Sequence, residues 1–213
     1  VEYLAMNAPL PVSFVVYQDV PLFTSAVCIR DNLCKDCNQK PVWIRLEKDG
    51  QIVCEMCTSA ENDTLSIESY VKNVELWDVE NPCLYQVRTE LICENTVVDV
   101  HEARVGFRSA RFEKDGFYLN GKKIKIRGLN RHQSFPYVGY AMPQSMQEFD
   151  ANVLKYELRL NAVRTSHYPQ SRYFIDRCDE IGLLVFTELP GWQHIGDEEW
   201  KTQAVKNVEE ILH

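Results

Sequence analysis

The hydrophobic pattern of the chain changes its period near Asn120-Gly121, and this change constrains the fold most strongly. Before it, short alternating or apolar runs follow one another with turn signals between them. After it, strand-like runs alternate with amphipathic helical segments. Seven or so short strands are typical of an antiparallel sandwich of immunoglobulin type, whereas alternating strands and helices indicate βα units around a parallel sheet. We therefore predict two domains, over residues 1–112 and 113–213.

Three βα units can be read in the second part of the chain. Their strands are predicted at residues 122–128, 161–165 and 183–187. Ser145 and Glu148 predict a capping box at the start of the first helix, whose apolar face is expected to hold Met146, Phe149, Val153 and Leu154. Gly182 is expected to end the second helix, and a third helix is expected over residues 198–212. Because a closed barrel needs eight such units, we expect only the first part of a TIM barrel.

Polar residues gather where each predicted parallel strand ends. The three clusters are Asn130-Arg131-His132-Gln133, Ser166-His167-Tyr168, and Glu188 followed by Trp192. Taken singly, each such residue is equally well explained as an ordinary loop residue. Active sites of barrels are built at the carboxyl ends of the strands, however, so three clusters in register predict a functional site.

Arg164 lies in the middle of the apolar run NAVRT, where it would point into a barrel. A buried guanidinium must be paired with a carboxylate, and Glu188 or a glutamate outside this chain is the expected partner. Trp192 and Tyr168 offer flat apolar faces of the kind on which sugar rings pack, although aromatic residues belong to the core at least as often.

Composition excludes several classes of partner. Lys and Arg number 23 against 31 Asp and Glu, and the resulting net charge of -8 disfavours binding to nucleic acid or to an anionic membrane surface. No apolar run approaches the roughly 20 residues of a membrane span, and the first residues lack the features of a secretory signal. Eight cysteines are too few for a disulfide scaffold in a chain of this length, so a reducing, cytoplasmic compartment is expected.

Two cysteine pairs have the spacing of a structural zinc site with four thiolate ligands, namely Cys34, Cys37, Cys54 and Cys57. The second pair follows a hairpin turn predicted at Lys48-Asp49-Gly50 and lies in the strand-like run QIVCEMC. Strand residues three apart face opposite sides, so one metal could bind both thiols only if this strand breaks. Buried or surface thiols are the alternative reading.

Two long segments, RGLNRHQSFP and NAVRTSHYPQSRYFIDRCDEIGLLVFTE, resemble the signature regions of glycoside hydrolase family 2. The resemblance covers residues 64–213 well, and the earlier residues only by strand pattern. It implies an immunoglobulin-like β-sandwich followed by a partial (β/α)8 TIM barrel. It also implies a retaining β-glycosidase with two catalytic glutamates about 5–5.5 Å apart. Both glutamates are expected beyond His213, so no catalytic residue is expected in this chain, which should be inactive alone.

The resemblance also implies roles for individual residues. His132 and His167 match histidines that contact the sugar, and Arg164 matches an arginine that orients the nucleophile. Glu188 matches the acidic residue at the end of the third strand, while Asn130 and Arg131 match supporting residues. Trp192 stands where some relatives have an acidic magnesium ligand and His194 could match their histidine ligand, which puts a magnesium site in doubt. No cofactor is required by the implied chemistry.

The triplet RHQ favours a β-galactoside, or a related sugar, as the substrate of the parent protein, which we expect to be a homo-oligomer. A β-glucuronidase is the alternative within the family. A carbohydrate-binding module without catalysis and a zinc-stabilised structural module are the alternatives from other classes.

Overall fold

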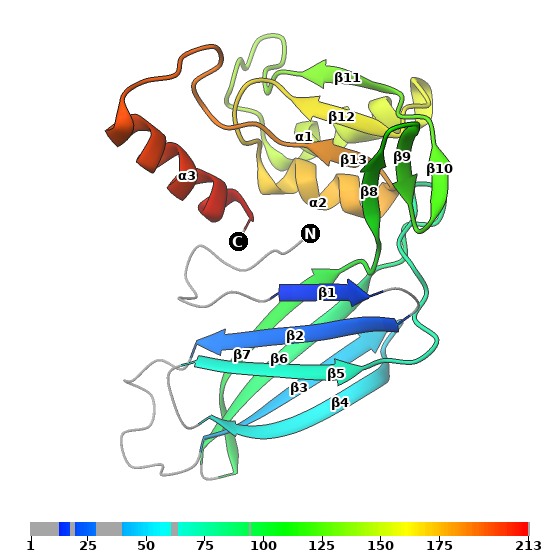
Figure 1. Ribbon diagram of the computed structural model, residues 1–213, viewed down its shortest axis with the longest axis vertical. Coiled ribbons are helices and arrows are strands. Elements are labelled where there is room, and N and C mark those ends of the chain that lie inside the picture. The colour runs from blue at the N-terminus through cyan, green and yellow to red at the C-terminus, as the bar shows by residue number, and fades with distance from the viewer. Residues whose placement is uncertain (1–12, 18–19, 29–39, 61–63, 94, 213) are drawn as a thin grey trace. The chain divides into compact units, whose positions relative to one another are not determined.

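The computed structural model describes residues 13–17, 20–28, 40–60, 64–93 and 95–212. They form two compact units (Figure 1). The first contains the described residues up to Glu75 and those between Leu84 and Phe107, and the second contains Leu76–Cys83 and Arg108–Ile211. The expected boundary between residues 112 and 113 stays a prediction.

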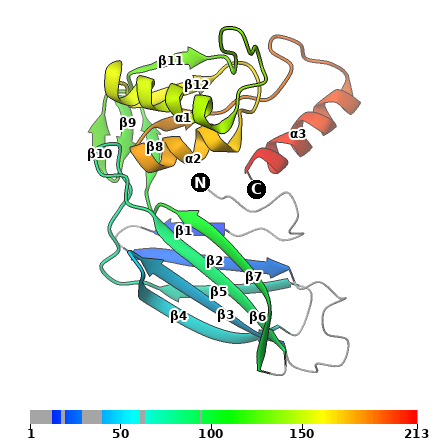
Figure 2. The same cartoon turned by 180° about the vertical axis from the view of Figure 1, so that it is seen from behind.

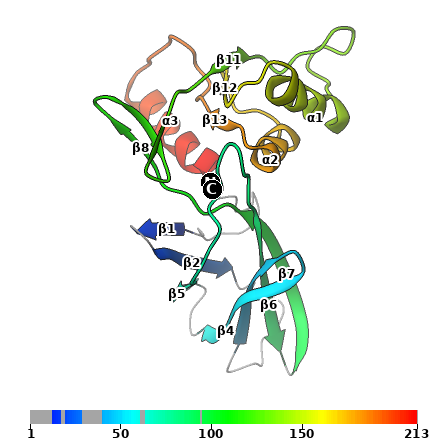
Figure 3. The same ribbon diagram turned by 90° about the vertical axis from the view of Figure 1, so that its right-hand side faces the viewer.

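The first unit is an antiparallel sandwich of two sheets, as expected (Figures 1 and 3). One sheet has the strand order β1-β2-β5, with β1 at Ser13–Tyr17, β2 at Val20–Cys28 and β5 at Thr64–Tyr70. The other has the order β4-β3-β6-β7, with β3 at Lys40–Lys48, β4 at Gln51–Ala60, β6 at Tyr85–Cys93 and β7 at Thr96–Val105. Alternate residues of β3 and β6 are buried, because successive side chains of a strand point to opposite faces: Val42, Ile44, Leu46, Tyr85, Val87 and Leu91.

The hairpin turn between β3 and β4 is at the predicted position. Asp49 has φ 51° and Gly50 has φ 75°. Two consecutive positive φ values are the backbone of the turn that best matches the twist of the flanking strands, and aspartate followed by glycine is a sequence that adopts it.

The cysteines of the first unit oppose the zinc prediction. Residues 54–57 pair with Leu46 to Trp43 without a register shift, so the thiols of Cys54 and Cys57 lie on opposite faces of β4. Cys34 and Cys37 lie outside the described residues.

The second unit contains two small sheets (Figure 2). One is antiparallel, with the order β10-β9-β8, and consists of β8 at Ala110–Glu113, β9 at Gly116–Leu119 and β10 at Lys122–Ile124. The other is parallel, with the order β11-β12-β13, and consists of β11 at Gly128–Arg131, β12 at Ala162–Thr165 and β13 at Leu184–Phe186.

The predicted first parallel strand, residues 122–128, is wrong. Asn120 and Gly121 both have positive φ and turn the chain into a hairpin, so Lys122–Ile124 pair with β9 instead. The side chain of Asn161 then holds the following segment, because its Nδ2 donates to the Lys125 carbonyl and its Oδ1 accepts from the Arg127 amide. The parallel strand begins only at Gly128.

Three helices accompany the parallel sheet: α1 at Gln144–Asn152, α2 at Arg172–Ile181 and α3 at Glu198–Leu212. A π-helical turn, η1 at Val153–Glu157, follows α1. Side chains from α1, η1, β12 and α2 form the core of this unit, which consists of Ala151, Leu154, Val163, Phe174, Cys178, Ile181 and Leu183. The third helix agrees with its prediction.

The predicted capping box of α1 is wrong, and its predicted apolar face is confirmed only at Leu154, which belongs to the core. Pro143 is the N-cap and makes no side-chain cap, and Glu148 accepts a hydrogen bond from Gln144 instead of closing a capping box with Ser145. Gln147 is buried in α1, whereas Phe149 is 51% exposed. The buried face of α1 is therefore rotated toward Gln147, which accepts a hydrogen bond from the Arg131 guanidinium. Hydrophobic spacing does not reveal such a polar contact.

The segment Leu76–Cys83 leaves the sandwich between β5 and β6 and packs in the second unit. Trp77 is buried and its indole Nε1 donates to the Asp179 carbonyl at 2.7 Å. The Lys155 ammonium donates to the carbonyls of Val79 and Gly182, and burial lowers its pKa. Gly182, at φ 79°, ends α2 as predicted. None of the described helices is both long and apolar enough to span a membrane.

Candidate functional site

Three adjacent parallel strands bring Arg164, Glu188 and Asn130 together. Arg164 on β12 is in register with Asn130 on β11 and with Phe186 on β13, two residues before Glu188. The Arg164 guanidinium forms an ion pair with Glu188, as the sequence predicted, and its Nη1 lies 3.4 Å from the Asn130 Oδ1. The Arg164 side chain is 47% exposed, however, because the three described parallel strands leave this face of the sheet open.

Glu188 also holds His167. The two carboxylate oxygens are divided between two partners, since Oε1 pairs with Arg164 and Oε2 lies 3.0 Å from the His167 Nδ1. A carboxylate at Nδ1 favours the tautomer that carries its proton there and fixes the orientation of the ring. The His167 Nε2 is thereby left to act as an acceptor toward a ligand.

The remaining predicted residues form an aromatic group around His167. The rings of His132 and His167 have centroids 5.3 Å apart at an interplanar angle of 75°. The Trp192 ring lies 5.8 Å from His167 and is 71% exposed. The structure thus gathers all six residues predicted from the sequence at one edge of the sheet: Asn130, His132, Arg164, His167, Glu188 and Trp192.

Arg131 lies in the same strand but points to the opposite side. Its guanidinium donates to Asp150 at 2.8 Å and 3.0 Å, donates to Gln147 at 2.8 Å, and lies 3.9 Å from the centre of the Phe174 ring. Burial lowers the pKa of Arg131, and the hydrogen bond and charge of Asp150 oppose that shift. These contacts are consistent with a supporting role beneath the site.

Sequence reasoning missed the roles of Gln133 and of the Tyr168 hydroxyl. The backbone N–H of Gln133 donates to the Tyr168 Oη, and the side-chain Oε1 of Gln133 accepts from the backbone N–H of Ser171. These contacts join residues up to 38 positions apart, and no local pattern marks them. The one signal in the sequence for a role in the site is that Gln133 directly follows His132 and Tyr168 directly follows His167.

The described residues contain no cluster of three or more His, Cys, Asp or Glu side chains suited to a metal ion. His194, the expected counterpart of a magnesium ligand, has its ring 5.7 Å from that of Trp200. The neighbouring Trp192 supplies no oxygen ligand. The donor set around His194 therefore does not fit magnesium, which prefers oxygen ligands.

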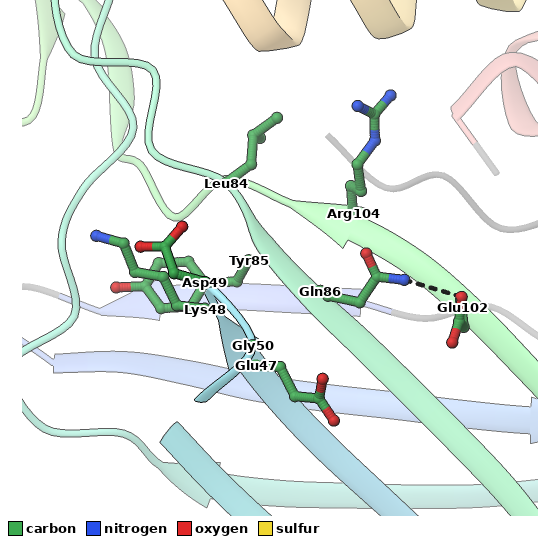
Figure 4. A pocket seen from close by; sticks show the side chains of 9 residues that line it. All are labelled: Glu47, Lys48, Asp49, Gly50, Leu84, Tyr85, Gln86, Glu102 and Arg104. Atoms are coloured by element: carbon green, nitrogen blue, oxygen red, sulfur yellow. Dashed lines mark hydrogen bonds between the residues drawn. The ribbon is translucent and has the colours of Figure 1, made fainter. Parts of the chain in front are cut away.

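A cavity of about 320 Å³ in the sandwich is a weaker candidate (Figure 4). Glu102 and Gln86 in its wall are hydrogen-bonded to each other at 3.1 Å, and Lys48 forms an ion pair with Glu75. Tyr85, the aromatic residue among the nine lining residues, is buried in the sandwich. This cavity offers no exposed ring to a sugar, so it does not support the carbohydrate-binding module.

Comparison with known proteins agrees with the resemblance. The model of glycosyl hydrolases family 2 matches residues 44–108, and that of the family 2 TIM barrel domain matches residues 110–210. The chain belongs to glycoside hydrolase family 2. Its architecture is accordingly the immunoglobulin-like sandwich followed by part of the TIM barrel of that family, as predicted.

Individual members of family 2 show how much of the fold is present. A β-galactosidase of Thermoanaerobacterium thermosulfurigenes is 58% identical over 142 residues, which are 67% of this chain and 20% of that protein. A β-galactosidase of Thermoanaerobacter pseudethanolicus is 51% identical over 170 residues, 78% of this chain and 23% of that protein. The crystal structure of a Parabacteroides merdae β-glucuronidase matches 94% of this chain with a TM-score of 0.82 at 25% identity, and 26% of that chain is covered. The chain thus spans about a fifth to a quarter of the length of these relatives.

Proposed function

We propose that the whole protein containing this chain is a retaining β-glycosidase that hydrolyses terminal β-D-galactosides. This chain supplies one wall of the sugar pocket, and the acid/base and nucleophile glutamates lie in the rest of the protein. The observation that supports this most directly is the Glu188 carboxylate, which binds both Arg164 and His167 beside His132 and Trp192. This is a group of fixed polar side chains with an exposed aromatic ring at the carboxyl ends of barrel strands.

The chemistry of the side chains fits this role. His132 and His167 offer ring nitrogens to sugar hydroxyls, and hydrogen bonds of this kind strengthen as the ring distorts toward the oxocarbenium-like transition state. The exposed Trp192 ring provides an apolar face for a sugar ring. Arg164, aligned by Glu188 and Asn130, lies where it can orient a carboxylate nucleophile from another strand.

Glu188 is not proposed as either catalytic glutamate. Both of its oxygens are already engaged, Oε1 with Arg164 and Oε2 with the His167 Nδ1, so neither is directed at a glycosidic oxygen or an anomeric carbon. We therefore expect the 213-residue chain alone to show no turnover.

The charges of the site favour a neutral sugar over a glucuronide. A uronate carboxylate is bound through a cation, most effectively an arginine. Arg164 is engaged by Glu188 and by the nucleophile carboxylate that we propose it orients, and Arg131 is paired with Asp150 on the far side of the strand. Neither arginine is available to a uronate, and the two β-galactosidase relatives support the same preference.

Hydrolysis of nitrophenyl β-galactoside and nitrophenyl β-glucuronide by the whole protein tests the proposal. We expect turnover of the galactoside and a fall in kcat of about 100-fold or more for His167→Ala, because loss of one hydrogen-bonding group that stabilises the transition state costs about 10²–10³-fold. His101→Ala, on β7 of the sandwich, is the matched control and should leave kcat unchanged. Activity on the glucuronide alone would transfer the proposal to a β-glucuronidase. Activity on neither substrate would reject it.

We further propose that the whole protein is a cytoplasmic homo-oligomer that needs no metal or other cofactor. Free thiols at Cys57, Cys83 and Cys178 support a reducing compartment. Alkylation of freshly lysed cells should modify all eight cysteines of this chain, and a protected pair would indicate an oxidising compartment. Sedimentation gives the oligomeric state, and unchanged turnover in EDTA would agree with the absence of a metal.

A further inference from the structure

Two hydrogen bonds tie together the loops that follow β11 and β12. The backbone N–H of Gln133 donates to the Tyr168 Oη at 3.1 Å, and the backbone N–H of Ser171 donates to the side-chain Oε1 of Gln133 at 2.7 Å. Gln133 directly follows His132, and Tyr168 directly follows His167. We call Gln133 and Tyr168, with these two hydrogen bonds, the clamp; each of these two residues is the chain neighbour of one site histidine.

The clamp is anchored in the rigid part of the unit. Ser171 is the N-cap of α2, and α2 makes no side-chain cap of its own. The Gln133 Oε1 satisfies the Ser171 N–H at this helix start, where donors lack partners within the helix. Phe174 and Cys178, further along α2, are fully buried in the core. A side chain next to His132 is thus fixed to a helix that cannot shift without disturbing the core.

The Tyr168 ring also faces His132. Their ring centroids are 6.2 Å apart, and the His132 ring lies edge-on to His167 at 5.3 Å. The Tyr168 hydroxyl fixes the backbone at Gln133 while its ring borders the His132 imidazole. Both constraints act on the separation of the two imidazoles.

We propose that Gln133 and Tyr168 are positioning residues that set the separation and orientation of the His132 and His167 rings. This inference rests on the proposed function, in which both histidines contact the sugar. Reacting and binding groups must be held within a fraction of an ångström for full effect. Loss of the clamp should therefore weaken binding of the transition state more than binding of the ground-state substrate.

The same geometry assigns a role to the third residue of the RHQ triplet. The clamp uses an oxygen of the Gln133 side chain as acceptor, and a glutamate would present the same oxygen at the same reach. Because this side chain is engaged with the start of α2, an acid or amide here serves the clamp and does not read the sugar. The RHQ triplet is therefore not a valid basis for choosing a galactoside over a glucuronide, and the preference rests on the charges and relatives given above.

Three substitutions in the whole protein test the clamp. Gln133→Met removes the acceptor at similar size, Tyr168→Phe removes the hydroxyl and keeps the ring, and Gln133→Glu restores the acceptor. We expect the first two to lower kcat on nitrophenyl β-galactoside by about 10-fold or more with KM changed by less than about threefold, and Gln133→Glu to stay within about threefold of the unchanged protein. Tyr118→Phe, which removes a hydroxyl that donates to Asp115 on the hairpin of β9, is the control and should not alter kcat.

The readouts separate positioning from mere folding. Rates are expressed per active site titrated with a mechanism-based glycosyl inhibitor, and binding of a transition-state-like iminosugar is measured beside binding of galactose. The clamp predicts that iminosugar affinity falls by the same factor as kcat/KM while galactose affinity changes little. Equal losses for both sugars, or an unchanged kcat in Tyr168→Phe and Gln133→Met, would overturn the inference and leave the proposed function standing. An unchanged protein that hydrolyses neither substrate would overturn both.

Discussion

Alanine at Gly182 should destabilise the protein far more than alanine at Gly121, although both glycines have nearly the same backbone conformation. Gly182 has φ +79° and Gly121 has φ +74°. A left-handed conformation costs a residue with a Cβ about 1–2 kcal/mol. The Cβ at position 121 would meet nothing within 4 Å, whereas at position 182 it would lie 2.9 Å from the Val79 carbonyl carbon and closer still to its oxygen.

The obstacle at position 182 is backbone, so no side-chain rotation can relieve it. Forcing extra volume into a packed site costs about 1–3 kcal/mol, and with the backbone cost we expect roughly 2–5 kcal/mol in total for Gly182→Ala. Since 1 kcal/mol shifts the melting temperature by about 2–4 °C in a chain of this size, Gly121→Ala should lower it by about 2–8 °C and Gly182→Ala by about 4–20 °C. The reduced freedom of the unfolded chain is the same in both variants and cancels in their difference.

Scanning fluorimetry of the two variants beside the unchanged protein is sufficient to measure this difference. Equal melting temperatures for Gly121→Ala and Gly182→Ala would mean that Val79 does not pack against Gly182. In that case the assignment of Leu76–Cys83 to the second unit would be wrong.

Three further outcomes are expected. Asp150→Ala leaves the buried Arg131 charge without its carboxylate and should cost about 3 kcal/mol, seen as a lower melting temperature; a change within error would show that Arg131 is hydrated. Burial raises the pKa of the Cys178 thiol well above its ordinary value, so the folded state keeps a proton that the unfolded state loses above about pH 8.5. Stability should therefore fall between pH 8.5 and 10 more steeply than in Cys178→Ala, and parallel curves would contradict the assigned burial. Glu188→Gln frees both Arg164 and His167 and should lower kcat of the whole protein about 100-fold or more, as for other carboxylates that orient a histidine; a full-rate variant would exclude that role.

The parts of the fold that local patterns encode were predictable from the sequence. The turn at Asp49-Gly50, the stop at Gly182 and the last helix depend on neighbouring residues, and each lies where it was expected. The strand expected over residues 122–128 failed because two structures compete for it. The hairpin at Asn120-Gly121 takes its first residues into another sheet, and strand propensity alone cannot decide between the two pairings.

Some contacts of the candidate site were likewise predictable from the sequence, and others were not. The pairing of Arg164 with Glu188 was predictable because an arginine in an apolar strand requires a carboxylate, and the third strand supplies one. The contacts of Gln133 and Arg131 were not, because their partners lie on α1, at the start of α2 and in the loop after β12, whose placement is set by packing. Gln147, buried in α1 to accept from Arg131, violates the apolar spacing on which the helix face was predicted.

Because Leu76–Cys83 lies between two sandwich strands in sequence but packs in the second unit, it limits how genes of this family can recombine. The main chain enters the second unit between β5 and β6, returns to the sandwich, and crosses again after β7. A single recombination junction near residue 112 would therefore combine Trp77 and Val79 of one parent with Asp179 and Gly182 of the other. Hybrids that inherit residues 76–83 together with the barrel need two further junctions, and we expect lineages to transmit these two stretches of sequence as a matched set.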